Sequence, residues 1–221
     1  MLRRYILSSV AIVCFLSIAS IASVSGTSAV NTYVSGTITT TTWTASLSPY
    51  YVTGTITVST GDTLTIDPGV DVLFDADAQF IVEGVLNAVG TETDSIRFIK
   101  GAAVQWGGLR ISGGNVNTFA YTRISDANAG AAVNGGGIYV SGGQLLMDNS
   151  VLSGNIAGDG GALYNVATTT LTNCTIAGNT ASSDGGGIQN NYNDLTLTDC
   201  VIKGNNAGDW GAGLRNHTGT A

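Results

Sequence analysis

The second half of the chain repeats one short phrase, a glycine-rich turn followed by an apolar residue and its neighbour. The phrase reads GGGIY from Gly135, GGALY from Gly160, GGGIQ from Gly185 and GAGLR from Gly211, so its starts lie 25, 25 and 26 residues apart. A fixed period of about 20 to 50 residues is typical of a solenoid, in which each unit buries its apolar face only by stacking on the next. We therefore expect one quasi-linear body whose core grows with every coil.

A second shared phrase predicts short strands. It reads NSVLSGN from Asn149, NCTIAGN from Asn173 and DCVIKGN from Asp199. Apolar residues in both phrases recur at every second position, which favours strands over helices, and we expect two short strands in each unit. Alternation places two columns of side chains in the interior. These are Leu152, Ile176 and Ile202 in one column and Ile138, Leu163, Ile188 and Leu214 in the other.

Asparagine and glycine mark the sharp turns between these strands, because both tolerate a positive φ. Asparagines and one aspartate form two columns, each with one member per unit. The columns are Asn149, Asn173 and Asp199, and Asn155, Asn179 and Asn205. Stacked amides can bond to one another and to turn backbone, so we interpret these residues as structural.

Composition limits the function. Charged residues make up 10% of the chain, against about 25% in typical globular proteins. The net charge is -7 and only eight lysines and arginines are present, so no basic patch is available to bind nucleic acid. The acidic balance fits a soluble extracellular surface.

The N-terminus predicts export. Residues 1–26 combine Arg3 and Arg4 with an apolar run and then small residues, which is typical of a secretory signal; an uncleaved membrane anchor is the alternative. Residues 27–48 are a Thr- and Ser-rich leader or N-terminal cap, and residues 49–221 form the solenoid. The last repeat ends after its first strand, so we expect a longer protein with a missing C-terminal anchor. The expected location is secreted or at the cell surface, including an outer membrane, with membrane contact only through the signal segment or that anchor.

Two cysteines, Cys174 and Cys200, occupy the same position of adjacent repeats. Export would permit a disulfide between them. Side chains stacked in register project in parallel, however, so we expect buried, reduced, space-filling thiols.

One stretch carries a resemblance to a known family. Residues 48–101, SPYYVTGTITV and onward, followed by WGGLRIS from Trp106, resemble the opening of secreted right-handed parallel β-helix proteins of the pectin-lyase-like superfamily. The later repeats resemble those of polymorphic outer membrane proteins. The resemblance implies an all-β, right-handed parallel β-helix of about six or seven coils. This superfamily includes lyases, hydrolases and adhesins, so its likeness leaves the activity open.

The residues that follow the second interior column should point outward. They are Arg110, Tyr139, Tyr164, Gln189 and Arg215. Neighbours in such a column lie about 4.8 Å apart. Aromatic faces flanked by guanidinium and amide groups can stack on sugar rings and bond to them, so we expect ligand binding at this exposed column. An ordinary cross-strand ladder is the alternative.

Another column lies in the turn before the glycines. Its members are Asn134, Asp159, Asp184 and Asp209. Stacked like charges repel, so either water and salt screen the three carboxylates or a cation lies between them. Oxygen ligands of this kind suit Ca²⁺, which is the candidate cofactor, but we favour the alternative of solvated turn carboxylates and no cofactor.

The sequence therefore favours a β-helix scaffold, a stalk or adhesin-like module whose partners are polysaccharides or host or cell-surface glycans. The alternative implied by the resemblance is a polysaccharide lyase or glycoside hydrolase. A lyase needs clustered carboxylates and a base, and a hydrolase needs paired carboxylates about 5 to 10 Å apart. No basic residue of the regular coils stands beside a compact aspartate group in the sequence. We therefore assign no catalytic residue and do not favour an enzyme.

Overall fold

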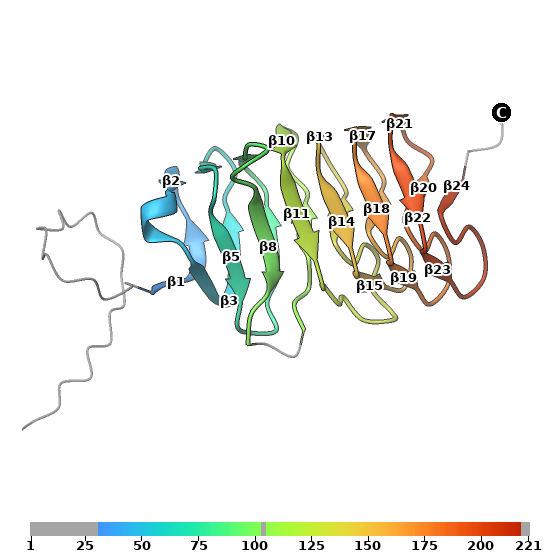
Figure 1. Cartoon of the computed structure of the whole chain (residues 1–221), viewed down its shortest axis with the longest axis horizontal. Helices are drawn as coiled ribbons and strands as arrows, with labels where there is room; N and C mark the ends of the chain where they lie inside the picture. The colour runs from blue at the N-terminus through green and yellow to red at the C-terminus, as the bar shows by residue number, and fades with distance from the viewer. Residues whose placement is uncertain (1–30, 103–104, 218–221) are drawn as a thin grey trace, which may run out of the picture.

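Alternating burial along short strands produces a three-sided solenoid (Figure 1). The computed structural model describes residues 31–102 and 105–217, so the predicted signal segment lies outside the described residues. One face of the solenoid is a parallel sheet of seven strands, one for each turn of the chain. In spatial order these are β2 (Thr41–Trp43), β4 (Thr63–Ile66), β7 (Val85–Val89), β10 (Val116–Ala120), β13 (Gln144–Asp148), β17 (Thr168–Thr172) and β21 (Leu195–Thr198).

The other two faces belong to one 14-stranded sheet that turns a corner at its longest strand, β3 (Tyr50–Val58). Residues 50–52 of β3 pair with β5, and residues 56–58 pair with β6. The second face continues through β5 (Asp71–Phe74), β8 (Ile96–Lys100), β11 (Thr122–Ser125), β14 (Val151–Ser153), β18 (Thr175–Ala177) and β22 (Val201–Lys203). The third face continues through β6 (Phe80–Val82), β9 (Leu109–Ile111), β12 (Ile138–Val140), β16 (Leu163–Asn165), β20 (Ile188–Asn191) and β24 (Leu214–His217).

Shorter elements complete the coils. Three two-residue strands pair at a corner of the later turns: β15 (Ile156–Ala157), β19 (Thr180–Ala181) and β23 (Asn206–Ala207). At the N-terminal end, β1 (Thr32–Ile38) pairs with β3, β2 pairs with β4, and a 3-10 turn (Ala45–Leu47) precedes β3. The leader segment therefore supplies the first strands of the solenoid.

The all-β parallel solenoid of about seven turns is confirmed, but the expectation of two strands per unit is wrong. Each unit has at least three strands, and the strand that the phrases did not reveal is the one on the seven-stranded face. Both interior columns are confirmed. Ile138, Leu163 and Ile188 are fully buried, whereas Leu214 is 37% exposed because no further strand stacks on β24 within the described residues.

The stacked asparagines hold the corner after the second face. Asn155 and Asn179 are fully buried, and the side-chain amide of Asn155 donates to Asn179 Oδ1. Asn179 donates in the same way to Asn205 Oδ1. The structural interpretation of this column is confirmed.

Cys174 and Cys200 are free thiols, and Cys174 is buried. Cys200 is only half-buried, which corrects the expectation of burial there; it precedes β22, the last described strand of the second face. Within residues 31–102 and 105–217, no helix is long and apolar enough to cross a membrane.

Candidate functional site

The expected ligand column exists as a register of paired strands on the third face. Tyr139 pairs with Arg110 on one side and with Tyr164 on the other. Tyr164 then pairs with Gln189, and Gln189 with Arg215. The structure therefore brings all five predicted residues into one line along the solenoid axis.

None of these five residues is fully exposed, which corrects the sequence prediction. Arg110, Tyr139 and Arg215 are half-buried, and Tyr164 and Gln189 are buried. Tyr164 is 9% exposed and Gln189 is 3% exposed. The glycine-rich turn folds back over the strand that it precedes, so a Cβ added to Gly185 would lie 2.8 Å from the Cα of Gln189. Alternation along the strand correctly gives the outward direction of these side chains but does not reveal the turn that covers them. The Oε1 atom of Gln189 is buried without a hydrogen-bond partner.

Arg110 lies at the start of the column and is held by backbone carbonyls. Its Nη1 atom donates to the carbonyls of Asn134 at 2.9 Å and Gly135 at 2.5 Å, and its Nη2 atom donates to the carbonyl of Gly107 at 2.6 Å. Burial lowers the pKa of the guanidinium to about 10. Within the described residues, no carboxylate lies within ion-pairing distance of Arg110. The three carbonyls use only part of the five N–H donors of the group.

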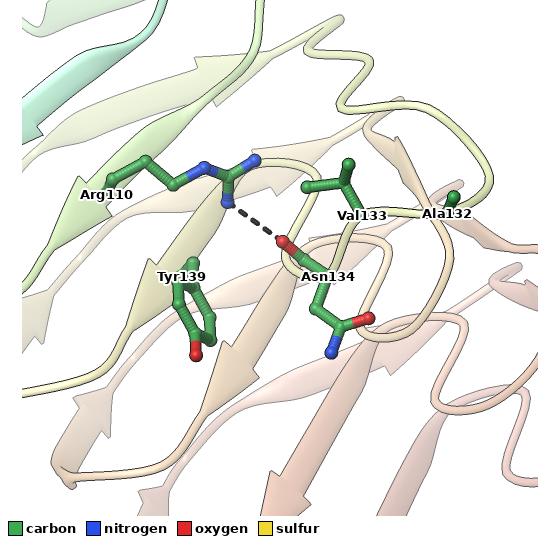
Figure 2. A pocket seen from close by; sticks show the side chains of 5 residues that line it. All are labelled: Arg110, Ala132, Val133, Asn134 and Tyr139. Atoms are coloured by element: carbon green, nitrogen blue, oxygen red, sulfur yellow. Dashed lines mark hydrogen bonds between the residues drawn. The ribbon is translucent and has the colours of Figure 1, made fainter.

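A pocket of about 360 Å³ opens beside this guanidinium. Figure 2 shows Arg110 and Tyr139 on neighbouring strands, facing a loop that carries the other lining residues, Ala132, Val133 and Asn134. The guanidinium carbon of Arg110 lies 5.9 Å from the centre of the Tyr139 ring, within cation–π range. The rings of Tyr139 and Tyr164 are 5.4 Å apart and tilted by 48°. The pocket thus combines an aromatic side chain, a fixed cation and an amide.

The turn column differs from its prediction at its last member. Backbone hydrogen bonds run from Gly135 to Asp159, from Gly160 to Asp184 and from Gly185 to Trp210. The position directly before each glycine therefore holds Asn134, Asp159, Asp184 and Trp210. Asp209 instead donates its N–H to the carbonyl of Ser183, one position away. The expected alignment of Asp209 with the other carboxylates is wrong.

The two carboxylates that do align have partners within the protein. Asp159 Oδ1 accepts a hydrogen bond from the N–H of Asp184, and Asp184 Oδ1 accepts one from the N–H of Trp210. The other carboxylate oxygen of Asp184 pairs with Arg215. Across the described part of the chain, no group of three or more His, Cys, Asp or Glu side chains is arranged to hold a metal ion.

The comparisons with known proteins identify the family. The family model for the right-handed β-helix region matches residues 86–219, which is more than half of the 221-residue chain. This chain is a right-handed β-helix protein. No curated protein and no solved structure matches it.

Sequence reasoning missed two parts of the β-helix site. One is the loop with Ala132 and Val133, which stands over Arg110 and has no periodic signal of its own. The other is Trp210, which is 68% exposed and has the guanidinium carbon of Arg215 5.4 Å from its ring centre. Its position directly before Gly211 is a signal that could have revealed it.

A second pocket, of about 330 Å³, lies farther along the β-helix. It is lined by Asn190, Tyr192, Asn193, Asp194, Leu195, Asn216 and His217. The rings of His217 and Tyr192 form a T-shaped pair with their centres 4.4 Å apart, and the His217 Nε2 atom is 3.3 Å from the Tyr192 hydroxyl. His217 therefore contacts the turn of the preceding coil.

Proposed function

We propose that this β-helix is a secreted or surface-displayed scaffold that binds glycans at the pocket between Arg110 and Tyr139. The observation that carries the proposal is the pairing of a partly exposed tyrosine with a half-buried guanidinium whose orientation is fixed by three carbonyls. Sugars present apolar C–H faces and polar hydroxyl edges. An aromatic ring stacks on the C–H face, and fixed hydrogen-bond donors bind the hydroxyl groups.

The site also has properties that reduce the cost of binding. Arg110 is held before any ligand arrives, so little side-chain entropy is lost on binding. Asn134 adds an amide that can both donate and accept. An adhesin-like role fits the regular strand ladder, which spaces such groups along one axis.

The proposal of surface display also draws on the resemblance of this chain to narrower groups of β-helix proteins. The opening coils resemble the pectin-lyase-like superfamily and the later repeats resemble polymorphic outer membrane proteins, which favours display outside the cell. Under this proposal the ligand is a polysaccharide or a cell-surface glycan.

A carbohydrate-active enzyme is supported less well. None of the five described residues that line the pocket is a carboxylate. Asp148, an acidic residue on the seven-stranded face, accepts hydrogen bonds from the side chains of Asn149 and Asn173. Paired carboxylates are what hydrolysis of a glycosidic bond requires.

The test is a panel of polysaccharides applied to the purified full chain, with and without Ca²⁺. The assay records binding and also the release of reducing or unsaturated ends. We expect binding without release, weakened about tenfold by Tyr139→Ala, which corresponds to the loss of roughly 1.4 kcal/mol of stacking. Tyr33→Ala is the matched control, because Tyr33 is 62% exposed on the first strand and far along the chain from the pocket.

Release of reducing or unsaturated sugar ends would contradict this proposal and show that the protein is a carbohydrate-active enzyme. Unchanged binding by the Tyr139→Ala protein would remove the pocket from the proposal.

A further inference from the structure

The second face of the solenoid carries an apolar stripe on its outer side. The stripe consists of Tyr51, Leu73 and Ile99, which pair in one register across β3, β5 and β8. Their strand neighbours, such as Val72 and Phe98, are fully buried in the core, so these three side chains point outward. All three are half-buried. Each of the three strands has a paired strand on both sides, so the stripe belongs to the regular part of the solenoid (Figure 1).

The strands under the stripe have the composition of strands that are covered on both faces. Residues 50–52 and 72–74 are apolar or aromatic without a break, although alternate side chains point to opposite sides. Such continuous runs are typical of parallel sheets in which both faces are buried. The feature is local, because the same register position on β11, β14 and β18 holds Ser125, Ser153 and Ala177. The composition therefore indicates a partner surface over β3, β5 and β8.

An ion pair runs beside the stripe. Asp71 of β5 pairs with Arg97 of β8, in the same strand register that pairs Leu73 with Ile99. The Arg97 side chain remains 48% exposed, so it is free to meet a second carboxylate. An outward row of one anion and one cation thus lies parallel to the apolar stripe.

This face is also where the cations of an acidic chain gather. The net charge of -7 makes two copies of the chain repel each other over most of their surface. The strands of the second face carry a single acid and four of the eight lysines and arginines. The acid is Asp71, and the basic residues are Arg97, Lys100, Arg123 and Lys203. Repulsion between two copies is therefore weakest at this face.

The ion pair and the stripe are complementary to themselves. A twofold axis parallel to the strands, between β5 and β8, places β5 of one copy over β8 of the other. Leu73 then lies over Ile99 of the second copy, and Asp71 lies over Arg97 of the second copy. The two ion pairs form a square of alternating charge beside an apolar contact.

We propose that a second copy of this chain covers the stripe, which gives a face-to-face dimer with antiparallel solenoid axes. Two sheets packed in this way lie about 10 Å apart. Only a few strands of each copy take part, so we expect a dissociation constant of about 10 to 100 μM. The pocket beside Arg110 is on the third face and stays outside this contact, so the inference does not depend on the proposed glycan binding.

Sedimentation equilibrium of the full chain between about 1 and 200 μM tests the dimer. We expect the wild type to pass from monomer to dimer over this range. Leu73→Asp places a carboxylate against Ile99 of the second copy and should raise the dissociation constant at least about tenfold. Leu146→Asp is the matched control, because Leu146 is also half-buried and points outward, but on the seven-stranded face. It should dimerise as the wild type does.

A charge exchange tests the orientation of the two copies. Asp71→Arg alone and Arg97→Asp alone each place like charges against their own copy, so each protein should remain monomeric. An equimolar mixture of the two should dimerise again, because a doubly cationic row then meets a doubly anionic one. A folding defect cannot produce this recovery, and circular dichroism of every variant checks the fold directly.

Three outcomes would overturn the inference. Monomers at every concentration exclude the dimer, and if hydroxyl radicals still fail to oxidise Leu73 in them, another part of the same chain covers the stripe. A dimer that Leu73→Asp leaves intact lies on another surface. Loss of the dimer in both charge variants without recovery on mixing would contradict the antiparallel arrangement.

Discussion

The side-chain amide of Asn155 donates to Oδ1 of Asn179 at 3.0 Å, and the same oxygen accepts the backbone N–H of Asn155 at 2.9 Å. Asn179 then repeats the arrangement one coil later with Asn205. Each asparagine thereby satisfies a buried corner of the coil before it. The amide of Asn179 donates twice, to Leu152 and Asn205, and accepts twice from Asn155, which a hydroxyl with its single O–H donor could not do.

Removing Asn179 should therefore be costly. Asn179→Ala leaves the N–H of Asn155 and the carbonyl of Leu152 buried without these partners. Each unsatisfied buried group costs about 1 to 3 kcal/mol, so we expect a loss of about 3 kcal/mol or more in the free energy of unfolding. Urea denaturation followed by circular dichroism measures it. Asn193→Ala, at an exposed turn, is the control and should change stability by less than about 0.5 kcal/mol. Equal losses in the two proteins would contradict the ladder's role.

Close stacking of the glycine-rich turns leads to a second prediction. A Cβ added to Gly161 would overlap the carbonyl oxygen of Gly186 and lie 2.7 Å from the carbonyl of Thr180. Both obstacles are backbone, which cannot rotate away, so Gly161→Ala should destabilise the protein by about 1 to 3 kcal/mol. Gly114→Ala is the matched control, because nothing lies within 4 Å of its added Cβ. Thermal melts of the two variants should differ, and a Gly161→Ala protein as stable as the control would show that the coils can separate at this turn.

The sequence predicted what depends on local pattern. Ile138, Leu163 and Ile188 could be placed in the core because alternation along a strand decides the side of each residue. The strands on the seven-stranded face were missed in the later coils because segments such as Thr168–Thr172 contain few apolar residues and no glycine phrase. Their pairing with β13 and β21 is a long-range property that no local pattern carries.

The order of the site residues along the column could be predicted from the sequence, but the burial of their side chains could not. The line from Arg110 to Arg215 follows from the repeat, whereas the burial of Gln189 depends on a turn that folds over it. Asp209 was grouped with the aspartates that precede the glycine phrases, but Trp210 lies between it and Gly211, and the backbone pairs Trp210 with that position. One residue of difference in turn length was enough to exchange a carboxylate for an indole.

The two thiols should differ in reactivity. Burial raises the pKa of Cys174 to about 11, while Cys200 is only half-buried. The thiolate is the reactive form, so near pH 8.5 we expect iodoacetamide to label Cys200 at least about tenfold faster than Cys174 in the folded chain. Peptide mapping by mass spectrometry after timed labelling measures the two rates. In urea the rates should converge, and equal rates in the folded chain would show that Cys174 is accessible.

The same pKa has a consequence for stability. Folding favours the neutral thiol, so the unfolded chain loses its proton first, near the ordinary value of 9.0. The contribution of Cys174 is therefore complete below about pH 9 and is lost as the pH rises toward 11. Cys174→Ala should flatten the fall in unfolding free energy over this window. An identical fall in wild type and variant would assign it to other groups.

Added Ca²⁺ should leave the melting temperature unchanged. Asp159 and Asp184 already accept backbone N–H groups, Arg215 neutralises Asp184, and Asp209 is out of line with both. A cation at this column would have to displace the guanidinium. Binding at one hundred times its dissociation constant would stabilise the fold by about 2.7 kcal/mol, which is several degrees in a melt, so calorimetry in about 1 mM Ca²⁺ is sensitive enough. Arg215→Gln is a useful second variant for the same measurement, because it removes the cation that pairs with Asp184. A rise in melting temperature in the wild type that Asp184→Asn abolishes would establish a calcium site where the carboxylates now bind only the protein.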